Sequence, residues 1–376
     1  MSDIYDELGV RKVINGHATV TFLGGSLMPD VVLKAMADAA RHFVDIDELQ
    51  AKVGQRIAEW TNNEAAYVSC GAAAGLVLST AASITGIDPE KRSRLPNTHG
   101  MKNEVIVHKK GRVSYDFAVR QAGGVLVEIG TDDGASAEEL ESAINERTAE
   151  ILYFYNVTSM GGQVPLEAAI DIARHHGVPL VVDAAAQIPP VENLWRFTGM
   201  GASLALFSGG KGLCGPQSSG LIVGDGSFID ACAFNACPRP FIGRPMKAGK
   251  EEIVGLMAAI RWYLDLDHAA LVDTYEQQIQ NVLDILAACP NISVKRSFPS
   301  EAGQPVPRAE IVLDESLLGL SRDELLARLR SGNPSIALAP SGSSGIYVNP
   351  QTLKSGQAEI IAQRIKEIVD GCRCSG

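Results

Sequence analysis

The sequence predicts an α/β fold: a large domain built on a mostly parallel sheet, followed by a smaller α+β C-terminal domain. Three observations predict it. Between Ala65 and Gly224, short apolar runs alternate with helical patterns, as expected for βαβ units and a parallel sheet. One of these runs ends in Asp183, at the strand end where open α/β sheets bind ligands. After Lys250 the pattern changes to two long helices and then to short mixed elements.

Each expected element has a local signal in the sequence. Ser136-Ala137-Glu138-Glu139 is a capping box that begins a helix, and Gly177 ends the next helix as a C-cap. Valine-rich and isoleucine-rich runs of four or five residues indicate buried strands. The expected helices lie near residues 31–42, 76–79, 136–145, 166–176, 251–266, 272–288 and 356–370. The expected strands lie near residues 65–68, 151–155, 178–183, 204–207, 221–223, 294–296, 309–313 and 335–338.

Length and composition bound the organisation of the chain. It has 376 residues, of which 46% are hydrophobic and 20% charged, an ordinary globular composition for about two domains. We expect an N-terminal arm over 1–45, a large domain over 46–255 and a small domain over 256–376.

Charge and cysteine content predict a cytoplasmic protein whose partner is a small molecule. The formal net charge of −11 argues against a nucleic-acid partner, because phosphate backbones require clustered Lys and Arg. No signal peptide and no apolar run long enough for a bilayer is present, so we expect no membrane partner. The seven cysteines are scattered without a zinc pattern, so we expect no metal, reduced thiols and a cytoplasmic location.

The most informative stretch is a loop in which Lys211 lies among glycines and small hydroxyl residues, between two apolar runs. Glycine allows the backbone to pass close to a ligand. A partly desolvated lysine loses its proton readily and acts as an amine nucleophile, as a Schiff-base lysine for pyridoxal phosphate (PLP) must. The alternative is a solvated lysine in a surface turn.

Two further features fit the same cofactor. Asp183 precedes Lys211 and could keep the pyridine nitrogen protonated, while the small Ala185 leaves room for a flat ring. The alternative role for Asp183 is to cap the next turn. A phosphate cradle is expected at Gly71, Ala72 and Ala73, where small residues lead into a helix whose free N–H groups bind anions, with Ser208 adding a hydroxyl. The alternative is an alanine-rich helix that packs closely.

These motifs resemble PLP-dependent enzymes with the transferase fold of the aspartate-aminotransferase type, and among them the selenocysteine-synthase-like group. The resemblance covers most of the chain, and the Lys211 loop and the stretch 246–253 are its most specific parts. Its other segments are 23–28, 43–50, 71–76, 100–106 and 182–186.

The resemblance implies a role for each candidate residue. Lys211 would carry the Schiff base, Asp183 would pair with the pyridine nitrogen, and Lys247 would reach a phosphate, across a subunit interface in one arrangement. A homo-oligomer, at least a dimer with shared active sites, is implied as well. The residues on the substrate side would be Asn15, Gly25, Ser26, His108 and Arg244.

Two positions depart from the pattern. Relatives often carry a His-Arg pair where this chain has Gly111-Arg112, so the neighbouring His108 is the candidate to cover the cofactor ring. Many enzymes of this fold bind the substrate carboxylate with a late arginine, but residues 334–350 hold neither Arg nor Lys. Arg239, Arg244 or a backbone nest would then bind the carboxylate.

The function that we expect is a PLP-dependent lyase. It would catalyse an elimination reaction on a hydroxylated amino acid and give a 2-keto acid and ammonia. One candidate substrate is a phosphorylated amino acid derived from a sugar. The alternative is an amino-acid racemase or epimerase, which shares the same cofactor residues. Two hypotheses come from other functional classes: a non-catalytic binder of sugar acids or phosphates, and a transferase that acts on tRNA. The negative net charge disfavours the transferase.

Overall fold

The computed structural model describes residues 3–156 and 161–372, and the chain divides into two compact units. The large unit comprises Ser26–Asp265 with Ala302–Gln304, and the small unit comprises Met1–Gly25, Leu266–Glu301 and Pro305–Gly376. The expected arm of 1–45 is therefore divided, because its first 25 residues belong with the small unit. The extreme ends of the expected arm and small domain, residues 1–2 and 373–376, lie outside the described residues.

The large unit is built on a seven-stranded sheet of order β2-β8-β7-β6-β5-β3-β4. The five strands from β7 to β4 run parallel, whereas β8 is antiparallel to both β7 and β2. The predicted mostly parallel sheet is thereby confirmed. The strands are β2 (Ala65–Ser69), β3 (Glu104–His108), β4 (Val125–Ile129), β5 (Thr148–Phe154), β6 (Leu180–Asp183), β7 (Leu204–Ser208) and β8 (Gly220–Gly224).

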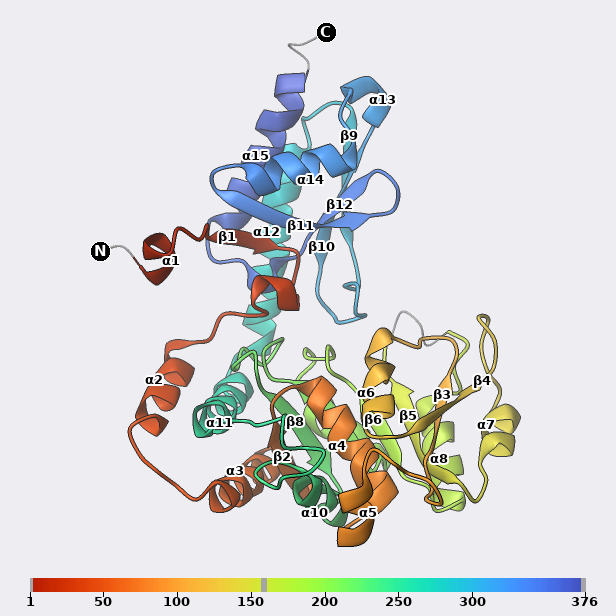
Figure 1. Ribbon diagram of the computed structural model, residues 1–376. Helices are drawn as coiled ribbons and strands as arrows, with labels where there is room; N and C mark the ends of the chain where they lie inside the picture. The colour runs from red at the N-terminus through yellow and green to blue at the C-terminus, as the bar shows by residue number, and fades with distance from the viewer. Residues whose placement is uncertain (1–2, 157–160, 373–376) are drawn as a thin grey trace. The chain divides into compact units, whose positions relative to one another are not determined.

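Helices pack on the sheet of the large unit, and α4 crosses in front of the strands in Figure 1. The capping box at Ser136 is present in full and begins α7 as predicted. The helices are α2 (Asp30–Ala39), α3 (Ile46–Trp60), α4 (Ala72–Thr85), α5 (Pro89–Arg94), α6 (Phe117–Gln121), α7 (Ala137–Ala143), α8 (Leu166–His175), α9 (Asn193–Met200), α10 (Gly226–Asn235) and α11 (Lys250–Leu264), with a 3-10 turn η2 at Ser114–Asp116.

The small unit contains a five-stranded sheet of order β1-β11-β12-β10-β9. Strand β1 comes from the N-terminus and pairs in parallel with β11, whereas the other pairs are antiparallel. The strands are β1 (Val13–Gly16), β9 (Ile292–Ser297), β10 (Arg308–Leu313), β11 (Ser335–Ser341) and β12 (Gly345–Val348). The helices are α1 (Ile4–Glu7), α12 (His268–Leu286), α13 (Glu315–Leu318), α14 (Arg322–Ser331) and α15 (Gln357–Cys372), with 3-10 turns η1 (Thr21–Leu23) and η3 (Pro350–Thr352).

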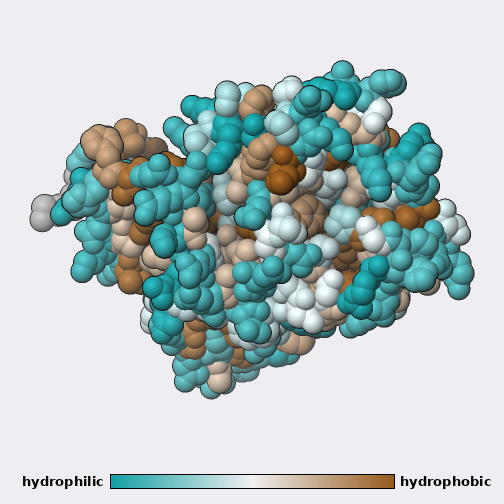
Figure 2. Space-filling view, turned by 90° about the horizontal axis from the view of Figure 1, so that it is seen from below, coloured by the Kyte–Doolittle hydropathy of each residue, from teal (hydrophilic) through white to brown (hydrophobic). Residues whose placement is uncertain are grey.

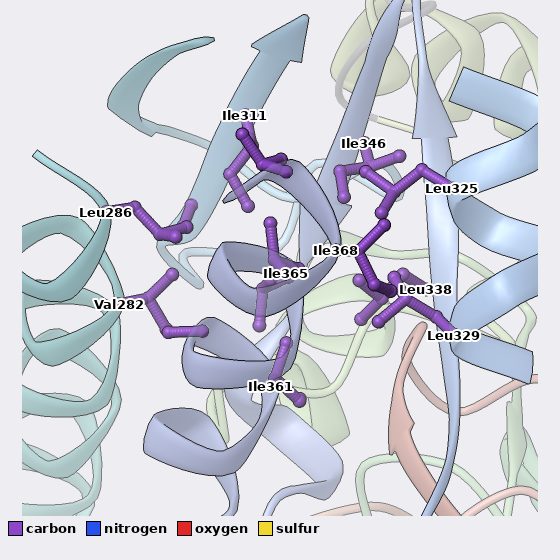
Figure 3. Packing of buried hydrophobic residues seen from close by; sticks show 14 of the residues in the cluster. Val282, Leu286, Ile311, Leu325, Leu329, Leu338, Ile346, Ile361, Ile365 and Ile368 are labelled. Atoms are coloured by element: carbon purple, nitrogen blue, oxygen red, sulfur yellow. The ribbon is translucent and has the colours of Figure 1, made fainter. Parts of the chain in front are cut away.

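The small unit has its own hydrophobic core, which α12, α14 and α15 form with the sheet (Figure 3). Ile365 of α15 is fully buried in its centre. In Figure 3 the labelled side chains from the helices and strands converge on α15, namely Val282, Leu286, Ile311, Leu325, Leu329, Leu338 and Ile346. This burial explains why a sheet with few strands holds together, since burying apolar surface is the dominant favourable term in folding.

The surface seen in Figure 2 is mostly hydrophilic, and its hydrophobic residues form separate small groups. No helix within residues 3–156 and 161–372 is both long and apolar enough to cross a bilayer. Among the same described residues, no cluster of His, Cys, Asp and Glu side chains is arranged to hold a metal ion.

Candidate active site

Lys211 lies in the loop between β7 and β8, and its neighbours in that loop are fixed by backbone contacts. The Gly209 amide donates to the Ser219 carbonyl at 2.9 Å, and the Cys214 amide donates to the Lys211 carbonyl at 3.0 Å. Ser26, predicted to line the substrate side, lies at this loop. Both its amide and its Oγ donate to the Gly210 carbonyl, each at 3.0 Å. The structure therefore brings Ser26 directly beside the lysine.

Asp183 ends β6, the strand next to β7, and its carboxyl is buried. Its Oδ1 accepts a hydrogen bond from the Ala185 amide at 2.9 Å, and the Ala185 carbonyl accepts one from the Ser208 amide at 3.3 Å. Burial raises the pKa of the Asp183 carboxyl, against the smaller lowering effects of the Ala185 amide and the charge of Lys211. Asp183, Ala185, Ser208 and Lys211 therefore share one place at the carboxyl ends of adjacent strands.

The start of α4, where the phosphate cradle is predicted, is a helix N-terminus without a side-chain cap. Gly71 is the N-cap residue with φ of 148°, and no side chain caps the helix, so the amides of the first turn remain available to an anion. An added Cβ on Gly71 would meet nothing within 4 Å, which leaves open space in front of these amides. The cradle thus has the donors and the room that a phosphate needs.

Close contact between β8 and the N-terminus of α4 holds the cradle beside the lysine loop. Gly220 begins β8 opposite Ser208, and an added Cβ on Gly220 would come within 2.4 Å of the Gly71 carbonyl carbon. No real Cβ fits there, so this position requires glycine. Sequence reasoning missed the role of Gly220, and its signal was only a glycine at the start of an apolar strand.

These residues fit PLP. The uncapped α4 terminus suits the phosphate, and the buried carboxyl of Asp183 suits a protonated pyridine nitrogen, because a cation beside a buried carboxylate favours its charged form. The amine of Lys211 is close enough for its charge to act on Asp183. Ala185, with its small side chain, is half-buried between Asp183 and Ser208.

His108 ends β3, which is separated from β6 by β5. It is 3% exposed and lies edge-to-face against the Tyr153 ring, with ring centroids 5.2 Å apart. Its Nε2 atom has no hydrogen-bond partner among residues 3–156 and 161–372, and burial lowers the pKa of His108 to about 4. His108 is therefore a neutral imidazole at neutral pH, and its contact with substrate or cofactor stays a prediction.

The other predicted residues are not brought to the lysine by any contact in the described residues. Lys247 and Arg244 are exposed in the segment before α11, and within residues 161–372 neither side chain makes a hydrogen bond or ion pair. Asn15 and Gly25 belong to the small unit. The Asn15 side chain binds its own turn, donating to the Ala18 carbonyl at 2.9 Å and accepting from the His17 amide at 3.0 Å.

Arg239, considered for the substrate carboxylate, already holds a carboxylate of the protein. Its two terminal nitrogens bind the two oxygens of Asp47 at 2.9 and 3.1 Å. This two-pronged pair uses the geometry that a substrate carboxylate would need. The sequence could not show this pairing, because the two residues are 192 positions apart.

Comparisons with known proteins identify the family of this chain. The family model of L-seryl-tRNA selenium transferase (SelA) matches residues 13–275. D-glucosaminate-6-phosphate ammonia lyase of Salmonella typhimurium is 33% identical over 375 residues, covering 98% of each chain. The 5'-C-glycyluridine monooxygenase-decarboxylase of a Streptomyces species is also 33% identical, over 97% of this chain and 92% of its own.

Solved structures give the fold and support the same family. A structure of D-glucosaminate-6-phosphate ammonia-lyase has a TM-score of 0.88 and 32% identity, covering 99% of this chain and 100% of its own. Aspartate aminotransferase of Thermotoga maritima, at 16% identity over 97% and 94% of the two chains, has a TM-score of 0.54 and shows the fold alone. The predicted PLP-dependent transferase fold of the aspartate-aminotransferase type is confirmed. The chain belongs to the L-seryl-tRNA selenium transferase (SelA) family, and it is a PLP-dependent enzyme of the lyase type.

Proposed function

We propose that the protein is an ammonia-lyase of the D-glucosaminate-6-phosphate type, which converts a hydroxylated and phosphorylated amino acid to a 2-keto acid and ammonia. The observation that carries the proposal is the grouping of Lys211, Asp183 and an uncapped helix terminus at the carboxyl ends of β6 and β7. The relative from Salmonella, 33% identical over nearly its whole length, is named for this reaction.

PLP, when bound, supplies an electron sink for the charge that develops at the substrate Cα. The Asp183 carboxylate pairs with the pyridine nitrogen and keeps it protonated, which strengthens that sink. Ser208 and the amides of Gly71, Ala72 and Ala73 hold the phosphate. The positions of these residues at the ends of β6 and β7 and at the start of α4 support the assignments.

Lys211 moves the proton that starts the reaction. Its Nζ removes the proton from the substrate Cα, acting as the general base. The hydroxyl on Cβ then leaves with a proton as water, which makes a double bond between Cα and Cβ. Addition of one water later releases ammonia and leaves the 2-keto acid, so the net change is loss of ammonia from the substrate.

The remaining assignments concern substrate recognition. Ser26 orients the lysine loop through the Gly210 carbonyl and borders the substrate, and Asn15, Gly25, His108 and Arg244 complete that side. Lys247 binds a phosphate, either that of the cofactor or that of the substrate. Because its side chain is exposed and makes no ion pair within the described residues, an anion can reach it without breaking an existing pair.

The test is a product assay on the PLP-loaded protein with D-glucosaminate-6-phosphate and a panel of hydroxy amino acids. Release of 2-keto acid and ammonia in equal amounts is expected, with loss of at least about 100-fold in rate for Lys211→Ala, the lower range for removing a general base. Lys102→Ala, an exposed lysine outside the site, is the matched control and should keep the activity.

Other outcomes identify the competing functions. Inversion at Cα without ammonia release indicates a racemase or epimerase. Oxygen consumption with release of carbon dioxide indicates a reaction like that named for the Streptomyces relative. A visible cofactor band that no amino acid alters indicates a non-catalytic binder, and any of these three results overturns the proposal.

We further propose a cytoplasmic homo-oligomer, at least a dimer with shared active sites, that binds neither nucleic acid nor membrane. The net charge of −11 and the free cysteines of the described residues support these assignments. Light scattering after size-exclusion chromatography tests the assembly, and a monomeric mass at micromolar concentration would contradict it.

A further inference from the structure

Glu150 is a fully buried carboxyl in the middle of β5, with an exposed fraction of 0%. Within residues 3–156 and 161–372, its hydrogen-bond partners are two hydroxyls of α4. Thr80 Oγ1 lies 2.7 Å from Glu150 Oε1, and Ser83 Oγ lies 2.5 Å from Oε2. Helix α4 is also the helix whose N-terminus forms the phosphate cradle. The acid therefore joins the cradle helix to the centre of the sheet.

The geometry at Ser83 shows which form of the acid the site suits. Ser83 Oγ lies 3.0 Å from the Ser79 carbonyl as well as 2.5 Å from Glu150. A hydroxyl has one proton to donate, so an ionised Glu150 and the Ser79 carbonyl compete for it. A neutral Glu150 donates to Ser83 instead, and Ser83 then donates to Ser79, so that every group has a partner.

We propose that Glu150 is a positioning residue: held as a neutral carboxylic acid, it fixes α4, and with it the amides of Gly71, Ala72 and Ala73, against the sheet. Thr80 lies about 12 Å along the helix axis from Ala72, at 1.5 Å per residue, and a helix transmits a displacement over that length. We call the hydrogen bonds that join Glu150 to Thr80 and Ser83 the clamp. The effect on cofactor binding rests on the phosphate role proposed above, whereas the neutral state of Glu150 and the clamp are independent of that role.

Among the described residues, no cation acts on Glu150. Val105 of β3 lies opposite it in the sheet, and the thiol of the buried Cys232 of α10 is close enough to interact with it electrostatically. Burial raises the pKa of Glu150 to about 7, and the two hydroxyls of α4 oppose that effect only in part. The clamp is therefore intact in mildly acidic solution and loosens as the pH rises through neutrality.

The first test uses the apoprotein and Glu150→Gln, whose amide can donate to Ser83 and accept from Thr80 as the neutral acid does. The unfolding constant of the wild type, relative to the variant, should rise about tenfold per pH unit between pH 4.5 and 7 and then level off. An infrared carboxylic C=O stretch should be present in the wild type at pH 5 and absent in the variant. Ser79→Ala, whose hydroxyl bonds only within α4, should behave as the wild type.

The second test measures the affinity of each protein for PLP by fluorescence titration across the same pH range. Above pH 7, wild type and Ser79→Ala should bind PLP severalfold more weakly than Glu150→Gln does, whereas the three proteins should bind it with similar affinity at pH 5. If Glu150→Gln does not fold, Ser83→Ala, which removes one partner of the acid, should weaken PLP binding at low pH.

Two results would overturn the inference. A stability difference that does not change with pH, together with no carboxylic stretch, would show that Glu150 is ionised. PLP affinities that vary with pH identically in Glu150→Gln and the wild type would show that the acid does not position the cradle. Because the first test uses no cofactor, it can succeed even if the proposed reaction is wrong.

Discussion

Asp183 and His108 show how burial shifts the pKa of two groups at the ends of parallel strands of one sheet, β6 and β3, which are separated by β5. Burial disfavours the charged form of any group, so it raises the pKa of an acid and lowers that of a base. Accordingly the pKa of Asp183 is raised, and that of His108 falls to about 4. A cation beside Asp183 would favour its charged form, and in the proposed site the pyridine nitrogen of PLP would be that cation.

The buried histidine makes stability depend on pH in a predictable direction. Between pH 4 and 6.5 the unfolded chain binds a proton at His108 that the folded chain does not, so the contribution of His108 is complete above pH 6.5 and is lost as the pH falls through 4. The comparison variant is His108→Phe, which keeps an aromatic contact with Tyr153. Relative to it, the free energy of unfolding of the wild type should fall by about 1.4 kcal/mol for each unit by which the pH is lowered in that window.

Denaturant unfolding at several pH values measures this difference. Glu150 titrates in both proteins, so its effect cancels from the difference. The control is His175→Gln, since His175 is exposed near the end of α8. A difference between the wild type and His108→Phe that stays constant from pH 4 to 7 would contradict the prediction.

At the scale of elements, the approach of β8 to the N-terminus of α4 builds the site. Strand β8 runs antiparallel between β7 and β2. Its first residue, Gly220, is therefore beside Ser208 on one strand and beside the turn after Ser69 on the other. The strand order thus places the phosphate cradle next to the end of β7, from which the lysine loop departs.

Gly220→Ala tests this approach. The added Cβ would overlap the Gly71 backbone, so α4 or β8 must move. We expect a destabilisation of about 1–3 kcal/mol, typical of overpacking, and a larger relative loss of PLP affinity. Thermal unfolding and PLP titration measure the two effects. Gly199→Ala, on an open face of α9, should be neutral or slightly stabilising, and equal PLP affinity in both variants would contradict the expectation.

At the scale of the whole molecule, the described residues include one hydrophobic core in each unit, and these two cores have no residue in common. One core lies in the small unit around α15, and the other lies between α4, α10 and the seven-stranded sheet of the large unit. Each core can lose its packing without direct change in the other. Proteins with more than one domain commonly depart from two-state unfolding for this reason.

Ile365→Ala should therefore destabilise the small unit selectively, by about 2–5 kcal/mol, the usual cost of such a truncation. The three tryptophans, Trp60, Trp195 and Trp262, all belong to the large unit. Tryptophan fluorescence consequently follows that unit, whereas circular dichroism follows both. In urea, the circular dichroism transition should broaden towards lower concentration while the fluorescence midpoint stays unchanged. Equal shifts of both signals would show that the units unfold together.

The sequence by itself determined the fold class, the cofactor and the local elements of this protein. Apolar periodicity, the capping box at Ser136 and the glycines around Lys211 act over a few residues, so their consequences can be read without knowing the rest of the fold. The parallel order of the strands then follows for β3 to β7, which is why Asp183 could be placed at the correct edge.

The tertiary structure alone decided which distant segments meet. It pairs β1 with β11 and so gives the first residues of the chain to the small unit, and it packs Gly220 on Gly71. It also commits Arg239 to Asp47 and places Glu150 under Thr80 and Ser83. These contacts depend on the three-dimensional path of the backbone. The partners of the buried acid Glu150, for example, are known only once helix α4 is placed on strand β5.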